Sequence, residues 1–147
     1  MLDKKDLAIL EILKHNSNLS TQKIAKKTNI PITTVHNRIK KLERAGIIKE
    51  YSIALDNKKI GKAIAAYVLI TVDYKLLQQL KISQYDLTRK LKSNSAVEEA
   101  AMITGASDII IKVRVKDMDK LNEFVTVYLR NIQGVEKTQT AVILNEA

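Results

Sequence analysis

The segment from Thr33 to Arg44 places hydroxyls, an amide, a histidine and four cations within twelve residues. Val35, Ile39 and Leu42 interrupt them at spacings of four and three, which predicts a helix with one narrow buried stripe. The polar side chains then point outward. An amide such as Asn37 can bond an adenine edge, and a cation such as Arg44 or Lys40 can bond a guanine edge or a phosphate. The chemistry indicated is recognition of a polar, anionic surface.

Two earlier helices are predicted to position this one. Asp3 can cap a first helix, whose inward positions are Leu7, Leu10 and Leu13, widened by Ala8, Ile9 and Ile12. Ser20 can cap a short second helix with Ile24 and Ala25 inward, which stops at Thr28 and Asn29. A four-residue turn then leads to Pro31, which suits the opening of the third helix. Two helices joined by such a turn after a packing helix form a helix-turn-helix, whose second helix enters the DNA major groove.

Several of these residues have ordinary alternatives. The polar face could be a solvated helix surface, and His36 could simply be exposed. Arg38 lies at the edge of the buried stripe, so it is either a phosphate contact or an internal buttress paired with an acid such as Glu11 or Asp6. The residues predicted to contact DNA are Ser20, Thr21, Thr33, Thr34, His36, Asn37, Arg38, Lys40, Lys41 and Arg44.

The net charge of +9 is concentrated in the first part of the 147-residue chain. Residues 1–62 hold fourteen Lys and Arg against six Asp and Glu, a net charge of +8. A basic segment joined to a near-neutral one indicates a polyanion-binding module attached to another domain. Cysteine is absent, which excludes disulfides, and two isolated histidines make a poor metal site. No apolar run approaches the roughly 18 residues of a membrane span, so a cytoplasmic protein without a membrane partner or metal is expected.

The chain divides by pattern into residues 1–50, a connecting strand and linker at 51–62, and a second domain at 63–147. Gly46 should end the third helix, and residues 47–55 alternate like a strand. The second domain reads β-α-β-β-α-β: strands at 63–72, 97–104, 108–115 and 135–144, with helices at 83–92 and from Asp117 or Asp119 onward.

This order predicts a ferredoxin-like antiparallel sheet with two helices on one face. Ser83 and Asp86 are placed like a capping box. The last helix should turn inward Leu121, Val125, Tyr128 and Ile132, and Gly134 should end it. The other sheet face, with Tyr67, Leu69 and Ile70, would be bare and should pack on another chain. The expected fold class is therefore α+β: a helix-turn-helix (winged-helix-like) domain joined to a βαββαβ domain.

Matches along nearly the full length identify a family. The opening LDKKDLAILEIL, the segment RIKKLERAGII at 38–48, the residues Tyr51, Leu55 and Gly61, the hairpin ITGASDIII at 103–111 and the final GVEKTQTAVIL stand in the order of the Lrp/AsnC (feast/famine) transcriptional regulators. The chain resembles that family, which implies a DNA-binding domain joined to an effector domain. Members form dimers through the effector sheets and assemble into tetramers or octamers. Many bind an amino acid between effector domains.

The resemblance also implies a ligand region. It comprises Gly105, Ala106, Ser107, Asp108, Thr138 and Thr140. Asp108 would accept from an ammonium group, and the loop N–H groups and the two hydroxyls would hold a carboxylate. The alternatives are a hairpin that needs Gly105 and Asp108 for its turn, and threonines chosen for strand propensity. Ala106 and Ser107 depart from the family, whose members often have an acidic or polar residue and an aromatic residue there.

The expected function is a sequence-specific DNA-binding regulator that acts on a palindromic operator as a homo-oligomer, with an amino-acid effector and no cofactor. An architectural DNA-compacting protein that ignores ligands is the alternative. An enzyme is disfavoured, because no nucleophile–base set or glycine-rich phosphate loop is present.

Overall fold

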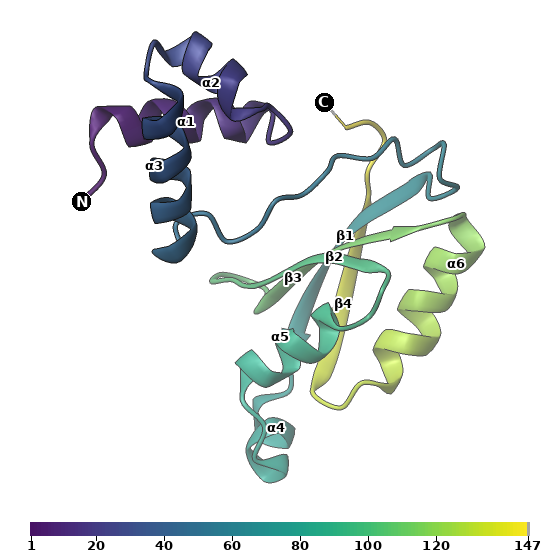
Figure 1. Ribbon diagram of the computed structural model, residues 1–147. Coiled ribbons are helices and arrows are strands. Elements are labelled where there is room, and N and C mark those ends of the chain that lie inside the picture. Colours follow the sequence, from purple (N-terminus) through teal and green to yellow (C-terminus); the bar gives the residue numbers. More distant parts are fainter. Residues whose placement is uncertain (147) are drawn as a thin grey trace. The chain divides into compact units, whose positions relative to one another are not determined.

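The computed structural model describes residues 1–146. The chain forms two compact units, and the division along the sequence falls between Ala54 and Leu55. This division falls inside the predicted connecting segment 51–62. The first unit contains α1 (Lys4–His15), α2 (Thr21–Thr28) and α3 (Ile32–Arg44), visible in Figure 1. Its core is a single cluster of buried aliphatic residues: Ile9, Ile24, Ala25, Ile30 and Val35.

The helix ends of this unit follow the predicted capping chemistry. The Asp3 carboxylate accepts from the Asp6 N–H, and Asp6 accepts from the Asp3 N–H in return, so the two form a capping box. Ser20 caps α2, and Asn29 ends it with a left-handed backbone, φ 55°. Since α2 ends at Thr28 and α3 begins at Ile32, the turn has three residues and not the predicted four.

The buried face of α1 differs from the prediction. Ile9 is fully buried, whereas Leu7 is 55% exposed and Leu10 and Leu13 are only half-buried. A helix with apolar residues on several sides can bury only the side that its neighbours cover. Here α2 and α3 cover the side of Ile9 and the carboxylate of Asp6, which a basic partner neutralises.

The predicted strand at 47–55 does not form within the chain. Gly46, with φ +69°, ends α3 as expected, and the Ile47 and Ile48 N–H groups close the helix on the Leu42 carbonyl. Beyond this point no residue up to the start of β1 joins a sheet. A strand needs a neighbouring strand for its N–H and C=O groups, and residues 1–54 supply none. Ile53 is accordingly 81% exposed.

The second unit has the predicted βαββαβ order and is ferredoxin-like. Its strands are β1 (Ile64–Val72), β2 (Val97–Met102), β3 (Ile109–Val115) and β4 (Val135–Val142). They form one antiparallel sheet in the order β2-β3-β1-β4. Figure 1 shows α5 (Gln84–Lys92) and α6 (Met118–Glu123) against one face of this sheet. The short helix α4 (Tyr74–Leu80), which follows β1, is an element that the sequence patterns did not predict.

Strand register divides the two sheet faces clearly. Val68 pairs with Ile111 and Ile70 with Ile109, and all four side chains are fully buried under the helices. The prediction that Ile70 lies on the bare face is therefore wrong. Successive residues of a strand alternate between faces, so Tyr67 and Leu69 are on the open face and Ile70 is not.

The last helix also departs from a regular 3.6-residue period. Asp117 caps α6, which continues as a π-helical turn at Phe124–Tyr128 and a 3₁₀ turn at Leu129–Asn131. The wider turn places the successive buried residues Phe124 and Leu129 five positions apart. Phe124 and Leu129 are buried, whereas Val125 and Tyr128, predicted to point inward, are only half-buried.

Candidate nucleic-acid interface and effector region

Helix α3 presents its polar residues to solvent, as its pattern predicts. Val35 and Leu42 are buried and Ile39 is half-buried beside them. The exposed side of the helix carries Thr33, His36, Asn37, Lys40, Lys41 and Arg44, and Thr34 is half-buried at its edge. Because three aliphatic residues anchor one side, the other side can contact a partner without disturbing the core.

The cations of α3 differ in whether a carboxylate lies close enough to form an ion pair with them. Lys40 Nζ lies 3.0 Å from Glu43 Oε2, and the Tyr51 hydroxyl donates to the other Glu43 oxygen at 2.8 Å. These two bonds, that of Tyr51 first, lower the pKa of Glu43 below its usual value. In residues 1–146 neither Lys41 nor Arg44 has a carboxylate within ion-pairing distance. These two side chains are therefore the cations of α3 best placed to meet phosphates or base edges.

Arg38 has the contacts of a buttress. Its Nη1 lies 2.6 Å from Asp3 Oδ2 and 2.9 Å from Asp6 Oδ1, which ties α3 to the start of α1. The Asp6 N–H and then the Arg38 guanidinium hold the pKa of Asp3 at about 2. The same pairs, that with Asp3 first, raise the pKa of Arg38. These bonds support the buttress alternative for Arg38 over a phosphate contact.

Helix α2 offers fewer unbonded hydroxyls for a DNA contact than predicted, and more exposed lysines. The Ser20 hydroxyl accepts from the Lys23 N–H at 3.3 Å and so acts as the helix cap, and Thr21 is half-buried. Exposed cations at Lys23, Lys26 and Lys27 were not in the predicted contact set. The sequence predicts their outward direction, because they flank the inward-facing Ile24 and Ala25.

The predicted effector loop joins β2 to β3, and its aspartate is hydrogen-bonded to other elements of the second unit. Asp108 Oδ2 accepts from the Val72 N–H at 2.8 Å, and Oδ1 accepts from the Tyr74 hydroxyl at 2.9 Å. The second of these bonds raises the pKa of Tyr74. The Asp108 carbonyl also accepts from the Gln84 side-chain amide at 2.8 Å. Asp108 therefore holds the end of β1, α4 and α5 together.

Tyr74 and Gln84 belong to this region although no sequence signal indicated them. Tyr74 opens α4, which was not predicted, and Gln84 is the first residue of α5. The Tyr74 hydroxyl lies 3.1 Å from Gln84 Oε1. Ala106 is exposed and Ser107 half-buried, so this part of the loop is accessible beside the network.

The two threonines of β4 lie beside the loop and not in contact with it. Thr138 pairs with Ile70 and Thr140 with Val68, so both side chains lie on the helix-covered face, at the edge strand β4, where Thr138 is half-buried and Thr140 exposed. Ile109, which follows Asp108, pairs with Ile70 from the other side. Two strand spacings of about 4.8 Å therefore separate Thr138 from Ile109, roughly 10 Å in all.

The open sheet face has an apolar part and an ionic part. Tyr67 and Leu69 are its apolar residues on β1. Beside them Arg114 Nη2 lies 2.8 Å from Glu146 Oε1, and Lys112 Nζ is 2.8 Å from the same oxygen. Arg114 first, and then Lys112, hold the pKa of Glu146 at about 2. Although it is charged, Arg114 is almost completely buried.

No helix within residues 1–146 is long and apolar enough to cross a membrane.

Two protein families match the chain in succession. Residues 2–49 match the winged helix-turn-helix DNA-binding family, and residues 65–147 match the Lrp/AsnC ligand binding domain. An uncharacterized HTH-type transcriptional regulator of Pyrococcus abyssi is 35% identical over 98% of this chain and 92% of its own length. The HTH-type transcriptional regulator FL11 of Pyrococcus furiosus is 32% identical over 98% of this chain and 90% of its own.

Solved structures agree with these matches. B. subtilis LrpC has a TM-score of 0.82 and 27% identity, covering 100% of this chain and 97% of its own. E. coli AsnC has a TM-score of 0.81 and 27% identity, with coverage of 99% and 94%. A transcriptional regulator of Neisseria meningitidis, solved as a complex with L-Met, has the same fold with a TM-score of 0.89 at 23% identity, with coverage of 99% and 92%.

Proposed function

The chain belongs to the Lrp/AsnC family of transcriptional regulators, and from this we propose that α3 reads a specific operator sequence in the DNA major groove. The observation that carries the proposal is the exposed face of α3, where Asn37 and Arg44 lie opposite the buried Val35 and Leu42. An amide and a free guanidinium can each bond a base edge in two places. Lys41, with Lys23, Lys26 and Lys27 of α2, would hold the phosphates on either side.

Binding to a selected operator tests this assignment. Asn37→Ala or Arg44→Ala should weaken specific binding by about 1–3 kcal/mol, which is roughly 5- to 150-fold. Arg130→Ala is the matched control, because it removes an exposed cation from the second unit. Both α3 variants should melt like the parent. Parent-like affinity in both would show that α3 does not read the operator.

The open sheet face supports a two-fold dimer. Tyr67 and Leu69 leave apolar surface uncovered on β1, and the simplest cover is the same face of a second copy. A two-fold dimer would space two α3 helices by whole turns of DNA, so operators should be palindromic. Light scattering at micromolar concentration tests the dimer and any tetramer or octamer. A monomer would contradict the assembly, and uniform rather than discrete footprints would favour the DNA-compacting alternative.

We also propose that an amino acid is the effector, held between two effector domains by the loop Gly105–Asp108 of one copy and by Thr138 and Thr140 of the other. The loop N–H groups at Ala106 and Ser107 would bind its carboxylate. The lone pairs that Asp108 leaves free would accept from its ammonium. The family match and the methionine-bound Neisseria regulator support this class of ligand.

Calorimetry with each common amino acid tests effector binding. Thr140→Val keeps the shape and β-branching of an exposed residue and removes its hydroxyl, so it should weaken the bound amino acid and leave the fold intact. A removed hydrogen bond to a charged group predicts about tenfold or more. A chain that binds no amino acid would retain the regulator assignment and lose the effector.

A further inference from the structure

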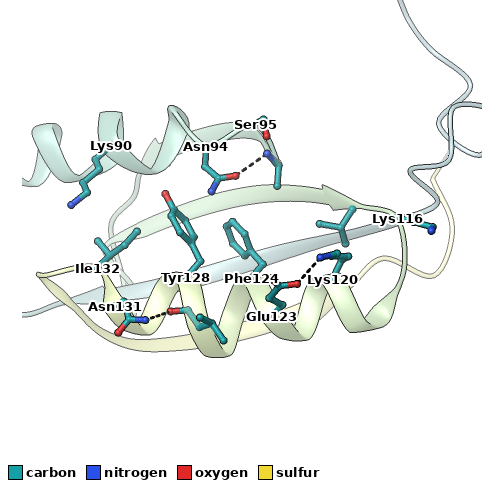
Figure 2. A pocket seen from close by; sticks show the side chains of 13 residues that line it. Lys90, Asn94, Ser95, Lys116, Lys120, Glu123, Phe124, Tyr128, Asn131 and Ile132 are labelled. Atoms are coloured by element: carbon teal, nitrogen blue, oxygen red, sulfur yellow. Dashed lines mark hydrogen bonds and ion pairs between the residues drawn. The ribbon is translucent and has the colours of Figure 1, made fainter.

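A groove separates the end of α5 from the last helix of the second unit, which consists of α6 and the π-helical and 3₁₀ turns that continue it (Figure 2). Its volume is about 870 Å³, within the range of roughly 300–1,000 Å³ that small-molecule sites occupy. It is distinct from the loop Gly105–Asp108 and the two threonines of β4, none of which lines it. Its contents are therefore a separate question from the amino-acid effector.

The floor of the groove is apolar and aromatic. Phe124 and Tyr128 point from the helix toward the end of α5, where Asn94 and Ser95 lie (Figure 2). Their ring centroids are 5.0 Å apart with the planes tilted by 38°. Val127, on the same wall, leaves 54% of its surface exposed. Phe124 is almost completely buried, so Tyr128 and Val127 offer the apolar surface that a ligand would contact.

The π-helical turn is what supplies this wall. Phe124, Val127 and Tyr128 all belong to the turn Phe124–Tyr128. Such turns are rare, occur mostly as single turns inside α-helices, and are frequent at functional sites. Here the turn contains an exposed valine and a half-buried tyrosine, and both line the groove. The groove thus coincides with the one π-helical turn of residues 1–146.

The charges of the groove are unbalanced. Lys90 and Lys116 line it, and neither has a carboxylate within ion-pairing distance in the part of the chain that the structure describes. The acidic lining residue is Glu123, and its Oε2 is bonded to Lys120 Nζ at 2.8 Å. The groove is therefore lined by three lysines and one glutamate, an excess of positive charge that favours an anionic ligand. A zwitterionic amino acid would bring an ammonium into this excess of positive charge, where the lysines repel it.

We propose that this groove binds an apolar monocarboxylate that has no amino group. Tyr128 and Val127, backed by Phe124, would hold the apolar body of the ligand, and Lys90 would bind its carboxylate. Figure 2 shows Lys90 at the same end of the groove as Tyr128 and Ile132. Aromatic 2-oxo acids and medium-chain fatty acids share this chemistry, and they differ in the shape of the apolar body.

Calorimetry of the full chain identifies the occupant. Phenylpyruvate and octanoate are the two probes, and L-phenylalanine is the comparison that adds an ammonium to the same aromatic body. We expect the carboxylates to bind at the groove at least tenfold more tightly than L-phenylalanine, since the lysines of the lining repel the ammonium of the latter. Tighter binding of phenylpyruvate than of octanoate would identify an aromatic ligand, and the reverse an alkyl one.

Variants locate the bound probe. Val127→Glu puts a carboxylate on the groove wall at an exposed position and should abolish binding, whereas Val127→Gln, of equal size without the charge, should retain most of it. Lys90→Gln should weaken binding about tenfold or more, because a charge-assisted bond is lost. Lys75→Gln removes an exposed lysine of α4 as the control and should change nothing. Melting curves verify that each variant is folded.

Three results would overturn the proposal. The first is that neither carboxylate binds at millimolar concentration. The second is that binding is unchanged in Val127→Glu, which would place the probe elsewhere. The third is that L-phenylalanine binds as tightly as phenylpyruvate and that Val127→Glu removes both, which would make the groove a zwitterion site. Binding of L-phenylalanine that persists in Val127→Glu belongs to another region, and the proposal stands.

Discussion

Gly134 is the glycine whose replacement the structure predicts to be most costly. It lies buried between the 3₁₀ turn and β4 with φ +98°, and its carbonyl accepts from the Asp73 N–H at 2.9 Å. A Cβ added there would lie 2.5 Å from Leu77 Cδ2 and 3.3 Å from Leu87 Cδ2. Both leucine side chains are almost completely buried, so neither can turn into solvent to make room.

Two costs add in Gly134→Ala. A non-glycine residue at such a φ stores about 1–3 kcal/mol of backbone strain. Forcing a methyl group into a packed core costs about 1–3 kcal/mol more. Gly105→Ala is the matched control, because Gly105 has φ +117° but a Cβ there would meet nothing within 4 Å. Gly105→Ala should therefore show only the backbone cost.

Urea unfolding of the full chain, followed by far-UV circular dichroism at one fixed protein concentration, measures both costs. The free energy of unfolding should fall by about 2–6 kcal/mol in Gly134→Ala and by about 1–3 kcal/mol in Gly105→Ala. The difference between the variants reports the collision with Leu77 and Leu87. Equal destabilisation would refute the reasoning, because it would show that the leucines yield without cost.

Three further predictions concern the first unit. The affinity of a dimer for DNA should fall with salt on a log–log slope of several units if about 6–10 phosphates are contacted, and residues 63–147 alone should bind no DNA; a slope near zero in a filter-binding assay would contradict this. The pKa of Asp3 is about 2 in the folded chain against its usual 3.8, so its stabilising contribution is present above about pH 4 and is lost as the pH falls through 2. Melting of parent and Asp3→Asn between pH 5 and 2 should show a steeper loss in the parent, and parallel curves would argue against the ion pair. Arg38→Ala should lower the melting temperature clearly more than Arg44→Ala, because only Arg38 bonds Asp3 and Asp6. Similar shifts would instead favour a DNA contact as the role of Arg38.

Local signals in the sequence were sufficient for most of the elements. Asp3, Ser20 and Ser83 cap their helices as their spacing predicts. The stripe of Val35, Ile39 and Leu42 also correctly indicates which side of α3 is exposed. These signals are short-range, since a cap or a helical stripe depends on residues three or four apart.

The failures have a different physical origin. Helix α4 has seven residues, too few for a periodic pattern, and the π-helical turn changes the period that the pattern assumes. The strand expected at 47–55 had suitable residues but lacks a neighbouring strand in the chain. The bonds of Asp108 to Val72, Tyr74 and Gln84 join residues 24 to 36 positions apart. Such pairs follow from the packing of elements, which a local pattern does not specify.

The bonds of Asp108 divide the loop Gly105–Asp108, where we propose that the effector binds, into a fixed and a variable part. This residue makes five hydrogen bonds through its backbone and carboxylate. Replacing it would therefore destabilise the fold, whatever its effect on ligand binding. The side chains of Ala106 and Ser107 make no hydrogen bond within residues 1–146, so the fold does not depend on them in this way. We expect ligand preference to diverge among relatives by changes at these two positions. Selection could then change what the loop binds without rebuilding the protein around it.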